Sequence, residues 1–453
     1  MKINLTDNNA GRSKEYCRKA VGVLFPIADK TIAELCQDNE NLLIFPHSLN
    51  FSDDIGGTPI LNIVNTNDPN KLRLKTNNIM GFIGVGNVRL KIRSRFDNET
   101  EDYFLHYMLQ RVLSFNLFDL THNNEQEGVF DFVMFMFPYY LKSALRHGIY
   151  REYRRFRYND ANPKGVIDIN RHLNRNMPFV GNFAYSTREY SHDNHVTQLI
   201  RHTIEYMMTS SYGRAILNID KDTINYVQSI IEHTPSYNKR ERSEVISKNL
   251  RSKNHPYFID YIPLQKLCIQ ILRMEEVKYG YADDEICGIL FDGAWLWEEY
   301  VNTLLSKDGF VHPENKLKKG RIYLFEDFDE EGRLHLSGVR YPDFYKENIV
   351  LDAKYKRFEK YEKVSQVDRN DIHQVITYMN NQNAKYGGFV VPYEHAKDKV
   401  VTSLLKGRTS HLSIYGLEIY RNAKTYKEFC SGMSLCEKKF FEQLHHITIY
   451  SHI

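Results

Sequence analysis

The stretch Tyr341–Lys356, YPDFYKENIVLDAKYK, decides how the last third of this chain is expected to fold. Residues 334–344 and 348–355 are rich in apolar and β-branched positions, and the polar residues 346–348 lie between them. Two such runs separated by a polar turn predict strands that pair as a hairpin. This hairpin is the frame that places the charged residues of the stretch.

Three charged side chains are expected to meet on the hairpin. Asp352 and Lys354 lie two residues apart, so the pleat of the second strand directs both to one face. Asp343 lies near the turn on the first strand and approaches Asp352 when the strands pair. Converging carboxylates repel each other unless a cation joins them, and their oxygen ligands suit Mg²⁺ or Mn²⁺. The pattern favours a divalent-metal site; an ordinary surface ion pair on an edge strand is the alternative.

A predicted helix downstream carries polar residues that suit the same site. In DIHQVITYMNNQ, Asp371, Gln374 and Tyr378 fall on one helical face. There they would orient metal ligands or hold a DNA backbone, and ordinary helix-surface polarity is the alternative.

A second predicted helix lies upstream, at residues 294–306, AWLWEEYVNTLLS. Its apolar residues recur with the spacing of a core-facing helix. Glu298 lies at the border of the apolar face and is a candidate metal ligand, whereas we expect Glu299 to point further toward solvent. A solvated carboxylate is the alternative for Glu298.

In chain order, these residues resemble the PD-(D/E)xK nuclease superfamily, in the branch with a Gln-x-x-x-Tyr helix. The set is Glu298, Asp343, Asp352-x-Lys354 and Gln374-x-x-x-Tyr378. A longer likeness, from about Asn78 to Val391, is to McrC-type subunits of modification-dependent restriction systems. It is carried by LWEEYV, YPDF, LDAKYK and DIHQVITY, and more loosely by NPKGVIDINRHL and REYSHDNHVTQLIRHTI. One departure is Thr197-Gln198, where the family usually has an Asn-Arg pair; Arg201 is a candidate substitute.

The resemblance implies roles for these residues and a partner for the chain. Asp343 and Asp352 would bind Mg²⁺ with support from Glu298, Lys354 would assist the water and phosphate, and Gln374 with Tyr378 would steady the site. The implied partner is a separate McrB-like AAA+ hexamer that hydrolyses GTP. The chain has no Gly-x4-Gly-Lys-Ser/Thr loop, so we expect it to bind no nucleotide itself.

Length and composition predict a large multidomain protein, and the resemblance implies a mixed α+β or α/β class. With 453 residues and 42% apolar content, the chain has material for several cores. We expect an N-terminal partner-docking or DNA-binding region at 1–125 with a β-hairpin near 78–93. A largely helical region with basic patches follows at 126–282, and the nuclease domain, a mixed sheet flanked by helices, at 283–453. No signal peptide or membrane-length apolar run is visible, so the expected location is the cytoplasm.

DNA binding is expected to depend on local basic patches, because the net charge is only +3. Two patches stand out, at residues 142–158 and 239–253. The candidate DNA-binding residues are Arg151, Arg154, Arg155, Arg157, Lys248 and Arg251. A solvated surface or a docking surface for an acidic partner is the alternative.

Taken together, the sequence predicts a Mg²⁺-dependent DNA endonuclease subunit of an McrBC-like anti-phage restriction complex. Two alternatives remain. One is a RecB-like DNA exonuclease that works in repair. The other is a non-cutting adaptor that activates a partner GTPase.

Overall fold

The chain folds into two compact units in the computed structural model. One unit comprises Met1–Asp119 together with Gly288–Ile453, and the other comprises Leu120–Cys287. The first and last segments of the chain therefore belong to one unit, and the three functional regions expected from the sequence stay a prediction. The residues that the structure describes are 1–38, 42–45, 57–85, 88–97, 102–113, 134, 136–250, 258–278, 286–313, 321–329, 332–395, 397 and 399–450.

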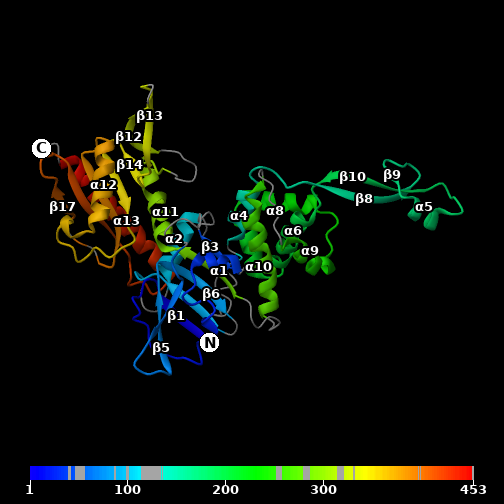
Figure 1. Ribbon diagram of the computed structural model, residues 1–453, viewed down its shortest axis with the longest axis horizontal. Coiled ribbons are helices and arrows are strands. Elements are labelled where there is room, and N and C mark those ends of the chain that lie inside the picture. The colour runs from blue at the N-terminus through cyan, green and yellow to red at the C-terminus, as the bar shows by residue number, and fades with distance from the viewer. Residues whose placement is uncertain are drawn as a thin grey trace. The chain divides into compact units, whose positions relative to one another are not determined.

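The first unit contains a five-stranded sheet that draws on both of its segments (Figure 1). The strand order is β1 (Lys2–Thr6), β7 (Val88–Arg93), β6 (Ile79–Val85), β11 (Ile286–Asp292) and β3 (Leu42–Phe45). β1 is parallel to β7, β6 is antiparallel to β7, and β11 is parallel to β3. β6 and β7 confirm the hairpin expected near residues 78–93, and β7 alternates buried and half-buried positions as predicted.

A smaller antiparallel sheet accompanies it. It consists of β2 (Tyr16–Cys17), β5 (Lys71–Thr76) and β4 (Leu61–Asn65), with β5 in the middle. The helix α1 (Ile32–Asp38) lies between β2 and β3 in the sequence. The sequence of this part of the chain shows no motif that predicts a chemical function.

A mixed sheet forms the C-terminal part of the same unit. Its order is β14 (Phe344–Lys346), β15 (Ile349–Ala353), β16 (Tyr386–Tyr393), β18 (His411–Glu418) and β17 (Val401–Leu404). The three central strands are parallel and the two edge strands antiparallel to their neighbours. The expected mixed sheet flanked by helices is therefore present.

Helices cover this sheet and join it to the rest of the unit. α12 (Arg369–Asn381) packs on a face that includes Val350 and Phe389. α11 (Gly293–Leu305) follows β11 directly and contacts both β15 and α2 (Tyr103–Leu113). α13 (Tyr426–Tyr450) contacts β18 and α2. Phe104 of α2 meets Trp297 and Tyr300 of α11 in an aromatic cluster.

The strand predicted over residues 334–344 is wrong as a continuous element. β13 (Leu334–Arg340) pairs with β12 (Ile322–Phe328), and only the short β14 pairs with β15. Pro342 has no backbone N–H and cannot continue a strand ladder, so the chain breaks there and starts again at Phe344. The β14–β15 hairpin itself is confirmed, with Lys346 opposite Ile349 across the turn.

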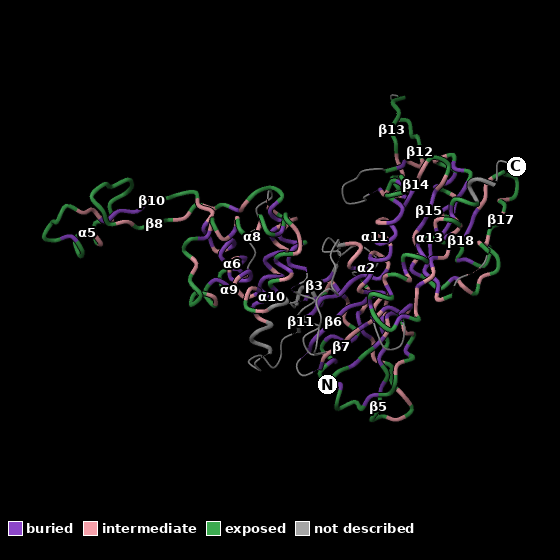
Figure 2. The backbone as a smooth tube through the Cα atoms, turned by 180° about the vertical axis from the view of Figure 1, so that it is seen from behind, coloured by how far each residue is buried: buried purple, intermediate pink, exposed green. Residues whose placement is uncertain are grey.

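The second unit is largely helical, as expected. Its main helices are α4 (Phe137–Leu145), α6 (His195–Met207), α7 (Ser211–Leu217), α8 (Lys221–His233), α9 (Arg242–Asn249) and α10 (Tyr261–Lys278). It also holds a three-stranded sheet of β8 (Glu152–Asp160), β10 (Phe183–Ser191) and β9 (Val166–Ile167), with α5 (Ile169–Asn176) beside it. Figure 2 shows these strands largely exposed or half-buried, whereas much of α6 and α10 is buried. None of the helices within the described residues is long and apolar enough to cross a membrane.

Candidate functional site

Strand β15 carries the centre of the candidate site. Asp352 is fully buried and lies opposite Phe389 of β16 in the parallel ladder. By alternation along the strand, Asp352 shares a face with Val350, which is the face that α12 covers. Lys354 Nζ lies 2.9 Å from Asp352 Oδ2, so the expected common face of these two side chains is confirmed.

Asp343 approaches the same strand from the break before β14. Its Oδ2 accepts a hydrogen bond of 2.8 Å from the backbone N–H of Ala353. Burial raises the pKa of Asp343 to about 8, and the negative charge of Glu298 adds to this rise while Lys354 opposes it. Burial also raises the pKa of Asp352 to about 8, with repulsion from Asp343 as the next cause. The two carboxyls therefore interact, as the hairpin predicted.

Lys354 is the counter-charge of this acidic pair. Asp352 and Asp343 raise the pKa of its amine well above the usual range, against the effect of burial. Its Nζ also donates to Gln374 Oε1 at 3.2 Å and lies 3.8 Å from Asp371 Oδ1. The lysine is thus positively charged throughout the working pH range and is held by three side chains.

Helix α12 supplies the expected polar face. Gln374 Nε2 donates to Tyr378 Oη at 3.2 Å, which extends the chain of hydrogen bonds that begins at Lys354. Asp371 Oδ2 lies 2.6 Å from Lys356 Nζ, so Asp371 is shared between two lysines. The predicted alignment of Asp371, Gln374 and Tyr378 on one helical face is confirmed.

Helix α11 brings Glu298 to the site. The pKa of Glu298 is raised to about 7, chiefly by burial and next by repulsion from Glu299 and Asp352. The side chain as a whole is 34% exposed. The expectation that Glu299 points further toward solvent than Glu298 is wrong. The Glu299 side chain is 32% exposed and that of Glu298 is 34% exposed. His312 Nε2 lies 3.8 Å from Glu298 Oε1 and 3.9 Å from Glu299 Oε1, so it is at nearly the same distance from both carboxylates.

His312 is a residue that the sequence did not reveal. Its Nδ1 donates to the backbone carbonyl of Asp343 at 2.7 Å, which leaves Nε2 directed at the two glutamates. The ring also stacks on Phe344, with 4.9 Å between the ring centres. His312 thus ties the segment that carries Asp343 to α11. No local pattern around residue 312 signals this, because its partners are distant in the sequence.

The donor set suits a hard divalent cation. Within the described residues, Asp352 Oδ1 is buried without a hydrogen-bond partner, which is costly for a carboxylate unless a ligand completes its shell. No group of three or more His, Cys, Asp or Glu side chains in the described ranges is placed so that it could hold a metal ion, so metal binding by Asp343 and Asp352 stays a prediction. Two carboxylates with water in the other positions match the habit of Mg²⁺. Asp343 and Asp352 therefore fit such an ion, and Glu298 as a ligand stays a prediction.

The basic residues of the second patch and of β8 are engaged to different degrees. Arg151, Arg155 and Arg157 are exposed, and Arg155 Nε donates to Ser186 Oγ at 3.0 Å. Lys248 pairs with Glu244 at 2.5 Å. Arg251 lies outside the described residues. DNA binding by these basic residues stays a prediction.

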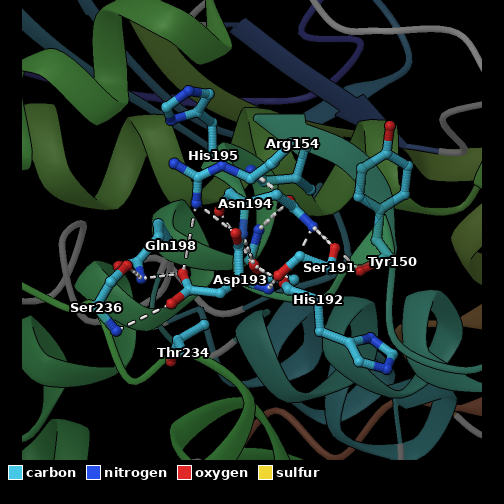
Figure 3. A network of polar contacts seen from close by, with 12 residues as sticks. Tyr150, Arg154, Ser191, His192, Asp193, Asn194, His195, Gln198, Thr234 and Ser236 are labelled. Carbon is cyan, nitrogen blue, oxygen red and sulfur yellow. Dashed lines mark hydrogen bonds and ion pairs between the residues drawn. The ribbon is translucent and has the colours of Figure 1, made fainter. Parts of the chain in front are cut away.

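Arg154 instead anchors the sheet of the second unit to its helices, in the network that Figure 3 shows. It donates to the backbone carbonyl of Asp193. Asp193 accepts hydrogen bonds from Gln198 Nε2 at 2.6 Å and from the N–H of Ser236 at 2.9 Å. Gln198, where the McrC pattern departs, therefore has a structural role at the start of α6.

Asn194 caps the same helix and Arg201 lies further along it. Asn194 Oδ1 accepts from the N–H groups of Val196 and Thr197, and Thr197 Oγ1 accepts from the backbone N–H of Asn194, which completes a capping box. Arg201 pairs with Glu205 at 2.8 Å and donates to the carbonyl of Ile231. That Arg201 substitutes for the missing Asn-Arg pair stays a prediction.

Comparison with known proteins identifies the family. A family model described as "McrBC 5-methylcytosine restriction system component" matches residues 74–392, and the chain belongs to this family. The matched span agrees with the likeness expected from about Asn78 to Val391. Comparison with curated proteins gave no match.

Two solved structures share the fold to different extents. One is a refined half-complex from a tetradecameric assembly of Thermococcus gammatolerans McrB AAA+ hexamers with bound McrC. It matches at 15% identity with a TM-score of 0.51, over 99% of this chain and 100% of that chain. The other, the cryo-EM structure of the Thermococcus gammatolerans McrBC complex, has 16% identity and a TM-score of 0.32, over 69% of this chain and 90% of that chain. The likeness to the first of these structures is one of fold alone.

Proposed function

We propose that this chain is the Mg²⁺-dependent DNA endonuclease subunit of an McrBC-like restriction complex. One observation carries the proposal: a fully buried Asp352, with one carboxylate oxygen unpartnered, lies beside Asp343 and 2.9 Å from a charged Lys354. Membership of the McrBC family supports the biological setting. In this proposal, β14, β15 and α12 form the heart of a PD-(D/E)xK nuclease core.

Asp343 and Asp352 would hold the ion, and Glu298 would support it from α11. When bound, Mg²⁺ polarises the phosphate and makes a coordinated water more acidic. The raised pKa values mean that protons must leave these carboxyls before both accept a cation. The affinity of the site for Mg²⁺ therefore rises with pH until both carboxyls have lost their protons.

Lys354 supplies the fixed positive charge of the site. Its amine offsets the negative charge that develops on the phosphate during hydrolysis. Gln374 accepts from this amine and donates to Tyr378, so the two residues hold Lys354 in one orientation. The chain of hydrogen bonds restricts the lysine to the side of the sheet where Asp352 lies.

A motor partner is the second part of the proposal. The Thermococcus gammatolerans structure is of McrB AAA+ hexamers with bound McrC. We infer that this chain likewise docks on an McrB-like AAA+ GTPase hexamer. Because the sequence holds no Gly-x4-Gly-Lys-Ser/Thr loop, the nucleotide would be bound and hydrolysed by the partner.

The test is cleavage of methylated and unmethylated plasmid in Mg²⁺, by the chain alone and with the AAA+ protein encoded beside it, with and without GTP. Cutting that requires the partner and GTP supports the proposal, and dependence on methylation identifies the substrate. Digestion from DNA ends by the chain alone would replace it with the RecB-like exonuclease. Stimulated GTP hydrolysis without any cutting would replace it with the adaptor.

A further inference from the structure

Arg95, two residues after β7, joins segments that are far apart in the sequence. Its Nη1 forms an ion pair of 3.1 Å with Asp7 Oδ2, and its backbone N–H donates to Asp7 Oδ1 at 2.6 Å. Its Nη2 donates to the backbone carbonyl of Tyr355. The guanidinium also lies 4.5 Å from the centre of the Tyr355 ring. The Asp7 side chain is fully buried and that of Arg95 is 10% exposed, so water competes little with these contacts.

Tyr355 is the point at which this contact reaches the candidate site. It follows Lys354 directly, and its hydroxyl lies 2.7 Å from Ser94 Oγ. Its ring and its carbonyl are thus both held by the end of β7. Ser94 and Arg95 follow β7 of the five-stranded sheet that contains β1, here named the N-terminal sheet. The N-terminal sheet therefore fixes the position of the backbone just beyond the Asp352-x-Lys354 pair.

Asn78 extends the contact to the helix that carries Glu298. Arg95 Nη2 donates to Asn78 Oδ1 at 3.3 Å, and the Asn78 carbonyl accepts from the N–H of Gly293 at 2.9 Å. Asn78 Nδ2 also donates to Asp292 Oδ1 at 3.5 Å, and Asp292 is the N-cap of α11. The start of α11 and the end of β15 are thus connected to one guanidinium.

The same two segments touch each other closely. A Cβ at Gly293 would lie 3.0 Å from Cε1 of the Tyr355 ring and 3.3 Å from Asn78 Oδ1. Glycine is therefore the residue that allows the start of α11 to lie against Tyr355. A small movement of Arg95 or Asn78 would be passed to both segments.

We propose that Arg95 is a positioning residue of the candidate nuclease site. It holds β15, with Asp352 and Lys354, and α11, with Glu298, in one fixed geometry. The inference deepens the proposed function and rests on it. It makes the N-terminal sheet part of the nuclease unit, beyond the docking role expected from the sequence.

The chemistry of arginine suits this role better than that of lysine. The guanidinium is a planar fork that donates in several directions at once and stacks on an aromatic ring. A lysine at the same place keeps the charge beside Asp7, which avoids an unpaired buried carboxylate. It cannot reach Asp7, Asn78 and the Tyr355 carbonyl together. The Arg95→Lys variant therefore keeps the positive charge beside Asp7 and loses the contacts that position Asn78 and Tyr355.

The experiment measures Mn²⁺ binding to the full chain by calorimetry, and cleavage against Mg²⁺ concentration with the AAA+ partner and GTP. Arg73→Lys is the matched control, because Arg73 also lies 3.1 Å from a carboxylate, that of Glu15, but with 47% and 37% of the side chains exposed. We expect Arg95→Lys to bind Mn²⁺ roughly 10- to 100-fold more weakly, as for other residues that orient metal ligands. Cleavage should recover at high Mg²⁺, and Arg73→Lys should behave as wild type.

Two further readouts separate positioning from folding. The Arg95→Lys chain should keep its thermal unfolding temperature within a few degrees and its stimulation of GTP hydrolysis by the partner. Wild-type Mn²⁺ affinity in Arg95→Lys overturns the inference, and so does a loss of affinity that accompanies lost stability and lost GTPase stimulation. Should Arg95→Lys not fold, Asn78→Ala decides the matter by the same measurements, with unchanged affinity again counting against the inference.

An Asp352→Asn chain distinguishes a failure of this inference from a failure of the proposed function. If Asp352→Asn binds Mn²⁺ and cuts DNA as wild type does, the site itself is misassigned and the inference falls with it. If Asp352→Asn loses both and Arg95→Lys loses neither, the site stands and only the positioning role of Arg95 is refuted.

Discussion

At the scale of single residues, the site places one buried carboxyl, that of Asp352, and one half-buried carboxyl, that of Asp343, beside one lysine. Asp343 and Asp352 both have a pKa raised to about 8, chiefly by burial. One lysine cannot neutralise two adjacent carboxylates, so the pair keeps a proton at neutral pH when no cation is bound. Without a cation, this arrangement of like charges lowers the stability of the folded state. The proposed cation site would relieve the repulsion.

The raised pKa of Asp352 predicts how stability depends on pH without metal. Its folded pKa of about 8 exceeds the ordinary value of 3.8, so the folded state binds the proton more tightly. The resulting stabilisation is complete below about pH 4 and is lost as pH rises toward 8. Asp352→Asn should therefore gain stability relative to wild type as pH rises from about 4 to about 8.

Thermal unfolding in the presence of a chelator, from pH 5 to pH 9, measures this difference. The gap between the two proteins should widen up to about pH 8 and then stay constant. A wild-type chain that remained as stable as Asp352→Asn at pH 8.5 would show that Asp352 is not a destabilised acid.

The charge of Lys354 predicts a second outcome. Lys354→Met removes the only cation within 3 Å of Asp352 in the described site, and cleavage should fall by about 10²- to 10³-fold. Lys356→Met is the matched control, since Lys356 is exposed and contacts Asp371 instead. Its effect on the cleavage rate should stay below about tenfold. Equal losses in the two variants would mean that the lysines serve DNA binding rather than the reaction.

At the scale of elements, the contact between β16 and α12 sets the position of Gln374 and Tyr378. A Cβ at Gly387 of β16 would lie 2.1 Å from Sδ of Met379 on α12. Gly387→Ala should therefore push the helix outward, destabilise the chain by about 1–3 kcal/mol and lower the cleavage rate.

Shortening the opposing side chain tests this explanation. The double variant Gly387→Ala/Met379→Ala should recover part of the stability and the cleavage that Gly387→Ala loses, because the clash is removed. Chemical denaturation and plasmid cleavage measure both. Additive losses in the double variant would contradict a steric cause.

The elements of the site were predictable where the sequence pattern is local. Apolar spacing predicted α11, the spacing of Asp371, Gln374 and Tyr378 predicted the polar face of α12, and alternation placed Asp352 with Lys354. Each of these patterns reports one face of one element. Pro342 breaks the strand that apolar content alone made continuous. His312 and Arg95 act through contacts with residues far along the chain, so no local pattern reveals them. The pairing of β11 with β3 is likewise a long-range contact.

At the scale of the whole molecule, the unit that carries the candidate site is built from two separated segments of the chain. β11 pairs with β3, and Phe104 of the first segment packs on Trp297 and Tyr300 of the last. Residues 286–453 alone would expose this apolar surface. We expect this fragment to aggregate or to stay unfolded, as judged by circular dichroism and gel filtration.

Joining residues 1–119 to residues 288–453 by a short flexible linker should instead give a folded protein that binds Mn²⁺. This protein lacks the second unit, so it also tests whether the basic residues of that unit are needed for metal binding. We expect that they are not needed. A stable, metal-binding 286–453 fragment would contradict the dependence of the site on the N-terminal segment.

The most direct test of the central claim is the Asp352→Asn chain assembled with its AAA+ partner, GTP, Mg²⁺ and methylated plasmid. Asparagine keeps the shape of the side chain but removes the carboxylate. The proposed site predicts no detectable cleavage, with GTP hydrolysis by the partner still stimulated as by wild type. Cleavage at the wild-type rate would contradict the claim that Asp352 is part of the catalytic centre.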